Sequence, residues 1–165
     1  MKKILTLMLA FAMLLGVTAC GTEAGKEPDK SAGLEGSLED ILAKIYETAD
    51  VDDNFKEWAK EGTQVVEITA ENAEYHLGSA DIEYEEAIVS DPLMMPSAYA
   101  LCLVRVKEVE AVKAVIKKKA NPQKWICVGV DPENVIVDSI GDVIFLVMSD
   151  DQAVALHDAF KGLQG

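Results

Sequence analysis

Two segments of this 165-residue chain, 98–104 and 143–148, are apolar at both alternating sets of positions. Successive side chains of a β-strand point to opposite faces of the sheet, so a strand that is apolar throughout must be covered on both faces. We therefore expect both segments to lie at the centre of a sheet that has cover on each side. No other feature of the sequence constrains the fold as strongly.

The second half of the chain passes twice through one order: short strand, turn, long apolar strand, amphipathic helix. The short strands, 83–90 and 133–138, mix acids and serine with apolar residues, which is typical of sheet edges. Ser149, with Gln152 three residues later, caps the second helix, and Gly162 stands near its end. This order predicts an α+β fold whose four-stranded antiparallel sheet comes from two ββα repeats. Both repeat helices should share one face, and N-terminal helices or a partner should cover the other.

The residues ahead of these repeats carry local start and stop signals. Ser37 can cap a helix, with Asp40 three residues later completing an approximate capping box. Residues 64–68 resemble a short extended piece. Thr69 is then expected to cap a short helix that stops at Gly78.

The N-terminus has the pattern of an export signal, with two lysines followed by an apolar run over residues 4–17. The run is shorter than the roughly 20 residues that a membrane-spanning helix needs. It ends in Val-Thr-Ala-Cys, which resembles the lipobox of bacterial lipoproteins. That resemblance implies cleavage between Ala19 and Cys20 and a lipid on the Cys20 sulfur. An ordinary cleaved signal with an incidental cysteine is the alternative.

Such processing would divide the chain into three parts. Residues 1–19 are a signal peptide that is removed, 20–36 are the lipidated Cys20 and a flexible tether, and 37–165 are one domain. The processed chain would carry 13 basic and 29 acidic residues, a net charge of −16. This charge disfavours nucleic acid as a partner. We expect a lipid-anchored protein on the extracytoplasmic face of a cell membrane.

The remaining cysteines and the histidines show no metal-ligand spacing, and we expect no metal or other cofactor. Cys102 and Cys127 both stand among apolar residues, and we favour two buried free thiols over a disulfide. His76 and His157 lie on expected helices without a partner three or four residues away. Surface or packing roles are the simplest interpretation of both histidines.

An acidic stretch resembles a calcium loop in part. Four oxygen-bearing residues stand at positions 1, 3, 5 and 12 of the EF-hand pattern: Asp50, Asp52, Asn54 and Glu61. Position 6 is Phe55, where the tight turn of the loop needs glycine. We interpret the match as chance in an acidic chain, and residues 50–63 as an irregular segment.

Two features are candidates for an interaction surface. The loop over residues 91–98 contains Met94 and Met95, for which we favour packing into the core over an exposed contact patch. Seven of the 13 basic residues of the processed chain lie in segment 105–124, including Lys117, Lys118 and Lys119. These lysines complement the negative end of the preceding helix, with a cationic surface for an acidic partner as the alternative.

Two longer stretches follow the lipobox and the polar tether: "ITAENAEYHLGSADIEYEEAIVSDPLMMPSAYALCLVRVKEVEAVKAVIKK" and "VIVDSIGDVIFLVMSDDQAVALHDAF". In this layout the chain resembles a family of small lipoproteins from low-GC Gram-positive bacteria that is known as a domain of unknown function. The resemblance covers residues 37–163 and departs at 50–63 and at "KWICVGVDPE". It implies a lipid anchor, but no activity and no catalytic residues.

No motif for a nucleophile, a phosphate-binding loop or a dinucleotide site is present. We therefore favour a binding or interaction module over an enzyme. One alternative is an envelope enzyme of the hydrolase type, with acids such as Asp131 or Glu133 converging on a histidine. The other is a structural assembly factor that pairs through a spare sheet face. Expected partners are the membrane, through the lipid on Cys20, and an unidentified protein or envelope component, a homodimer included.

Overall fold

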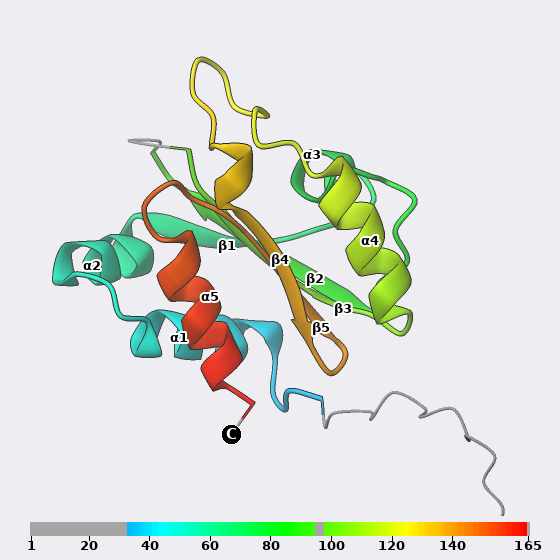
Figure 1. The fold of residues 1–165 in the computed structure, drawn as a ribbon, viewed down its shortest axis with the longest axis horizontal. Coiled ribbons are helices and arrows are strands. Elements are labelled where there is room, and N and C mark those ends of the chain that lie inside the picture. The colour runs from blue at the N-terminus through cyan, green and yellow to red at the C-terminus, as the bar shows by residue number, and fades with distance from the viewer. Residues whose placement is uncertain (1–32, 95–97, 165) are drawn as a thin grey trace, which may run out of the picture.

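Strands β3 (Ala100–Arg105) and β5 (Val143–Met148) lie side by side at the centre of an antiparallel sheet in the computed structural model, which describes residues 33–94 and 98–164 (Figure 1). Every residue of β5, and all of β3 except Arg105, is buried. The strand order is β1-β2-β3-β5-β4, so the predicted central position of the two apolar segments is confirmed. The fold class is α+β.

The sheet has five strands, so the prediction of four is wrong. Strand β1 (Thr63–Glu67) pairs antiparallel with β2 (Glu86–Pro92), with Val65 opposite Ser90. The expected extended piece is thus a strand of the same sheet, and β1 takes the edge that was assigned to β2. Strand β4 (Val135–Ile140) forms the other edge, as expected.

The two helices of the predicted repeats pack on opposite faces of the sheet, and the expectation of one shared face is wrong. Helix α4 (Val109–Lys119) buries Ile116 on one face, and α5 (Ala153–Gly162) packs on the other (Figure 1). Leu101 and Ile144 occupy matching places in the two long strands, yet they point to opposite faces. A shift of one residue in a strand reverses every side chain. The sequence similarity therefore does not produce a structural repeat.

Helices α1 (Leu38–Thr48) and α2 (Asp53–Glu61) lie on the same face as α5. The predicted capping box of α1 is confirmed, because the Asp40 N–H donates to Ser37 Oγ at 3.1 Å and the Ser37 N–H donates to Asp40 Oδ2 at 3.4 Å. Leu38, together with the residues at helical spacing after it, is buried against the sheet. The N-terminal helices therefore supply part of the cover that a partner would otherwise provide.

The prediction that residues 50–63 are irregular is wrong, because they contain α2. Asp52 begins the helix, and its Oδ1 accepts a hydrogen bond of 3.0 Å from the Phe55 N–H. The rings of Phe55 and Trp58 lie 6.0 and 5.1 Å from the ring of Tyr99, centre to centre. Aromatic packing therefore holds a helix whose other side chains are mostly charged.

The opposite face carries α4 and the short helix α3 (Ala73–Leu77). Gly78 ends α3 in the left-handed conformation, with φ of 84°, as its stop signal predicted. A Cβ at this position would collide with the Lys119 carbonyl. The expected cap at Thr69 is wrong, since α3 begins after Asn72, whose Oδ1 accepts from the Thr69 N–H at 2.7 Å.

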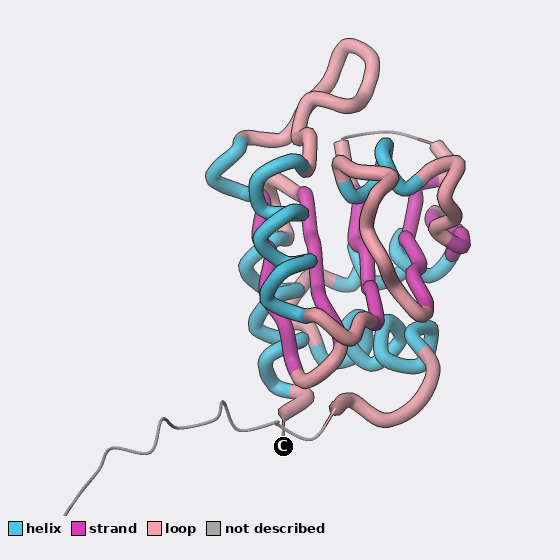
Figure 2. Tube along the Cα trace, turned by 90° about the vertical axis from the view of Figure 1, so that its right-hand side faces the viewer, coloured by secondary structure: helices cyan, strands magenta, loops and turns pink. Residues whose placement is uncertain are grey.

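The C-terminus and the long loop over residues 120–131 lie at opposite ends of the domain (Figures 1 and 2). The short helix η1 (Pro132–Asn134) connects this loop to β4. The expected cap of α5 at Ser149 is wrong, since α5 begins after Gln152, and Ser149 Oγ instead accepts from the Gln152 N–H in the turn before the helix.

Candidate functional site

The predicted cleavage and lipidation residues, Ala19 and Cys20, lie outside the described residues. In the part of the chain that the structure describes, no helix is both long enough and apolar enough to span a membrane.

The four residues of the calcium pattern do not enclose a loop. Asp52 is used as the cap of α2, and Asn54 and Glu61 lie within that helix. Among residues 33–94 and 98–164, no three His, Cys, Asp or Glu side chains are grouped so that they could hold a metal ion.

The predicted interaction residues lie on the surface. The side chain of Met94 is 80% exposed, so its expected packing into the core is wrong, and Met95 lies outside the described residues. Lys117, Lys118 and Lys119 form the exposed last turn of α4. The Lys119 amine donates to the Ser79 hydroxyl at 3.2 Å. Their contact with a partner is still a prediction.

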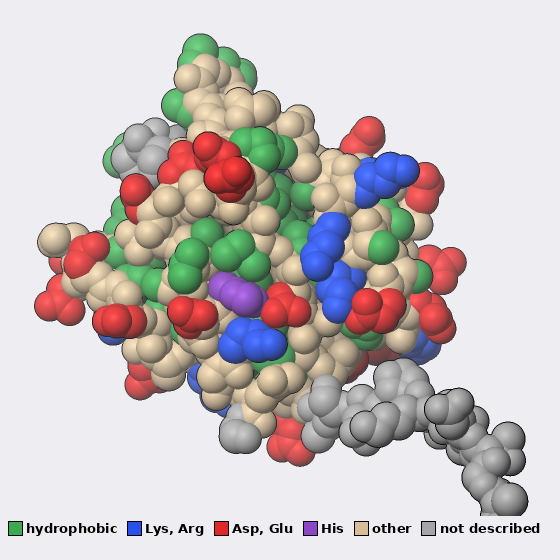
Figure 3. All heavy atoms as spheres, viewed as in Figure 1, with side chains coloured by type: hydrophobic (Ala, Val, Ile, Leu, Met, Phe, Trp, Pro, Cys, Tyr) green, Lys and Arg blue, Asp and Glu red, His purple; other side chains and the backbone are tan. Residues whose placement is uncertain are grey.

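The other basic residues of segment 105–124 do not extend this lysine patch into a continuous surface. Arg105 Nε lies 3.4 Å from Asp142, and the Lys124 amine lies 4.7 Å from the centre of the Tyr75 ring. Acidic side chains are spread widely over the face shown in Figure 3, and Lys and Arg side chains lie mainly over α4.

The two described cysteines are free thiols, as we favoured, but only one is buried. Burial raises the pKa of Cys102 on β3 to about 12. Cys127 is exposed in the 120–131 loop with φ of 66°, so its predicted burial is wrong.

The histidines occupy different environments. His76 is buried on α3, and burial, followed by the positive charge of Lys124, lowers its pKa to about 4. His157 Nε2 lies 2.7 Å from Asp138 Oδ2, a pair that joins α5 to β4. Burial raises the pKa of Asp138, but its hydrogen bonds, first that with His157, hold the pKa below its ordinary value. Sequence spacing did not indicate this pair.

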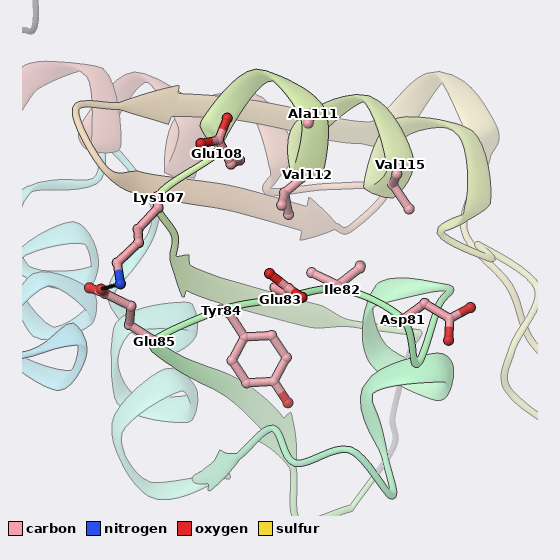
Figure 4. Close-up of a pocket in the computed structure, with 10 residues that line it drawn as sticks. All are labelled: Asp81, Ile82, Glu83, Tyr84, Glu85, Lys107, Glu108, Ala111, Val112 and Val115. Atoms are coloured by element: carbon pink, nitrogen blue, oxygen red, sulfur yellow. Dashed lines mark ion pairs between the residues drawn. The ribbon is translucent and has the colours of Figure 1, made fainter.

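A groove of about 380 Å³ lies between α4 and the segment 81–85, and we call it the α4 groove (Figure 4). Val112 and Val115 point from α4 toward that segment. The groove is lined by five apolar or aromatic and five charged residues: Ile82, Tyr84, Ala111, Val112 and Val115, with Asp81, Glu83, Glu85, Lys107 and Glu108.

The charges of the α4 groove are unbalanced. The Lys107 amine pairs with Glu85 at 3.2 Å. The carboxylates of Asp81, Glu83 and Glu108 have no ion pair or hydrogen bond with any other residue in the described part of the chain. The groove therefore presents three unpaired negative charges around an apolar lining.

Segment 81–85 explains how the sequence builds this arrangement. Its residues alternate acidic and apolar: Ile82 is buried and Tyr84 half-buried, whereas the acids that alternate with them are exposed. The Tyr84 hydroxyl donates to the Ile68 carbonyl at 3.0 Å, which fixes the ring. The alternation is visible in the sequence, but the second wall, which α4 supplies, is not.

A second groove, of about 580 Å³, lies between α1, α2 and the β1 edge of the sheet, and we call it the α1–α2 groove. Its lining comes from three sources: Glu39, Leu42, Ala43, Tyr46 and Glu47 on α1; Lys56, Ala59 and Lys60 on α2; and Thr63, Val65 and Ser90 on the sheet. Neither histidine lines either groove.

Comparison of the chain with protein-family models, with curated proteins and with solved structures gave no match. Function must therefore be argued from the geometry of these sites.

Proposed function

We propose that this protein is a lipid-anchored binding module on the extracytoplasmic face of a cell membrane, and that its α4 groove binds a small organic cation. The ligand class is an amine attached to an apolar body. The lipobox-like sequence ending in Cys20 and the polar tether after it support the anchor. The unpaired carboxylates around an apolar lining support the binding role.

The charge of the groove selects the ligand. Asp81, Glu83 and Glu108 attract an ammonium group, and no neighbouring lysine neutralises them. An aliphatic or aromatic body would cover Val115, which is only half-buried on α4, and this adds the favourable free energy of removing apolar surface from water. The volume is at the lower end of the range for small-molecule sites, roughly 300–1,000 Å³.

Binding explains the geometry better than hydrolysis does. A hydrolase needs a nucleophile within hydrogen-bond reach of a base. In the part of the chain that the structure describes, His157 bonds to Asp138, and no serine, threonine or cysteine side chain hydrogen-bonds to either histidine. The acids that line the α4 groove have no histidine among the other lining residues.

A comparison of three ligands with one body tests the proposal. The full-length chain, in mild detergent, is titrated by calorimetry with phenethylamine, 2-phenylethanol and phenylacetate. We expect saturable binding of the amine, at least about tenfold weaker binding of the neutral alcohol and weaker binding still of the anion. Equal affinities for the amine and the alcohol would contradict the proposal, as would the absence of amine binding.

A further inference from the structure

The α1–α2 groove has walls of opposite charge. Glu39 and Glu47 stand on the α1 wall, and Lys56 and Lys60 stand on the α2 wall. Lys56 and Lys60 are four residues apart, so they share one side of their helix. Within residues 33–94 and 98–164, none of these four side chains makes an ion pair or a hydrogen bond. The groove is therefore dipolar across its width.

The floor between these walls is apolar and partly uncovered. Leu42 of α1 and Ala59 of α2 line it, and Val65 of β1 is 48% exposed there. An apolar side chain of a ligand would cover Val65, which the helices leave open to solvent.

A chain of hydroxyl groups forms the base of the groove. The Tyr46 hydroxyl donates to Ser90 Oγ at 2.8 Å, Ser90 Oγ donates to Thr63 Oγ1 at 3.0 Å, and Thr63 Oγ1 donates to the Ala59 carbonyl at 2.6 Å. Because the single Tyr46 proton is used on Ser90, the 2.8 Å contact between Tyr46 and Tyr99 has Tyr99 as its donor.

The direction of this chain decides what the base can bind. Every hydroxyl proton from Tyr99 to Thr63 is committed inside the protein. Ser90 is completely buried, so only the half-buried hydroxyl oxygens of Tyr46 and Thr63 are left to a ligand. They offer lone pairs only, and a ligand at the base must donate. A peptide N–H or an ammonium group meets this requirement, and a choline headgroup, which has no N–H, does not.

We infer that the α1–α2 groove binds a short apolar peptide with both termini free. Its ammonium group lies toward Glu39 and Glu47, its carboxylate lies toward Lys56 and Lys60, and its apolar side chains cover the floor. This site is separate from the α4 groove, and its ligand differs from the simple amine proposed there because recognition also requires a carboxylate.

A set of blocked peptides tests both ends of the ligand. The full-length chain is titrated by calorimetry with leucyl-leucine, its N-acetyl form, its C-terminal amide and the doubly blocked form. We expect each block to weaken binding at least about fivefold, and both together to weaken it most. Equal affinities for all four would overturn the inference. Dodecylphosphocholine that competes leucyl-leucine off the protein would overturn it in favour of a zwitterionic lipid.

Charge-neutral variants assign the two walls. In Lys56→Gln/Lys60→Gln, we expect the preference for a free carboxylate to disappear and that for a free ammonium to remain. Glu39→Gln/Glu47→Gln should show the reverse. The control, Lys44→Gln/Lys118→Gln, removes the same charge from exposed residues outside the groove and should keep both preferences. Folded variants that discriminate like the unmodified protein would overturn the inference.

One further variant separates the two sites. Glu83→Gln/Glu108→Gln alters only the α4 groove, whose acids repel the carboxylate of leucyl-leucine, so the dipeptide should bind to this variant as it does to the unmodified protein. Loss of dipeptide binding in this variant would place the peptide in the α4 groove and overturn the second site. If this variant loses phenethylamine binding but keeps leucyl-leucine binding, the result supports two separate sites.

Discussion

The hydroxyl of Tyr99, a buried residue ahead of β3, lies 2.8 Å from the hydroxyl of Tyr46 on α1. Burial raises the pKa of both phenols, so both stay protonated at neutral pH. This contact joins the first helix to the centre of the sheet, across 53 residues of sequence. It therefore ties the hydroxyl chain of the α1–α2 groove to the core.

Tyr46→Phe should destabilise the fold by about 1–3 kcal/mol, because it leaves the buried Tyr99 hydroxyl unpaired. Urea unfolding measures the change in the free energy of unfolding. Tyr75→Phe is the matched control, since Tyr75 is 46% exposed and its effect should stay within about 0.5 kcal/mol. Equal effects of the two substitutions would show that the hydroxyl contact does not stabilise the fold.

Gly78→Ala should destabilise the protein by about 1–3 kcal/mol, because φ is 84° there and the new Cβ would meet the Lys119 carbonyl. Gly162→Ala, at the end of α5, meets nothing within 4 Å and should be neutral or stabilising by up to about 1 kcal/mol. Thermal unfolding of both variants checks the contrast. A tolerated alanine at position 78 would mean that α3 and α4 are not held this closely.

Stability should fall as the pH decreases from about 6.5 to 4. The pKa of His76 is about 4 in the folded protein and about 6.5 in the unfolded chain, so only the unfolded chain gains a proton in this window. The expected loss is about 3 kcal/mol at pH 4. Unfolding free energies of the unmodified protein and of His76→Leu, measured at pH 7, 5.5 and 4.5, isolate this contribution.

Asp138 also has a lowered pKa, but it contributes equally to both of these proteins. As the pH falls, the unfolding free energy of the unmodified protein should therefore decrease more than that of His76→Leu. Parallel pH profiles would contradict the assignment to His76.

Iodoacetamide should label Cys127 in the folded protein and spare Cys102. Cys127 is exposed, whereas Cys102 is completely buried and its pKa is raised to about 12 by that burial. Mass spectrometry of proteolytic peptides, before and after denaturation, measures the labelling of each thiol. Rapid native labelling of Cys102 would show that β3 opens far more readily than its packing allows.

Some of the fold could be predicted because its signals are local or dictated by burial. Segments 98–104 and 143–148 are apolar at positions that face both sides of the sheet, and this pattern alone predicted the central place of β3 and β5. The capping box of Ser37 and Asp40 was recognisable because both partners lie within one turn.

The rest depends on relations that are not local. Leu101 and Ile144 occupy matching places in the two long strands but point to opposite faces, and an odd difference in the length of the preceding turn is enough to cause this reversal. Helix α2 forms because Phe55 and Trp58 reach Tyr99, more than 40 residues away. The α1–α2 groove likewise draws on three separate segments, so its dipolar walls could not be recognised in the sequence.

The most direct test of the proposed function is phenethylamine binding to Glu83→Gln/Glu108→Gln, compared with Glu71→Gln/Glu133→Gln. Both variants of the full-length chain lose two exposed acids, but only the first pair lines the α4 groove. The account predicts at least about tenfold weaker binding to the first variant and a change of less than about twofold for the second. Equal losses would show a general effect of protein charge and would contradict the α4 groove as the binding site.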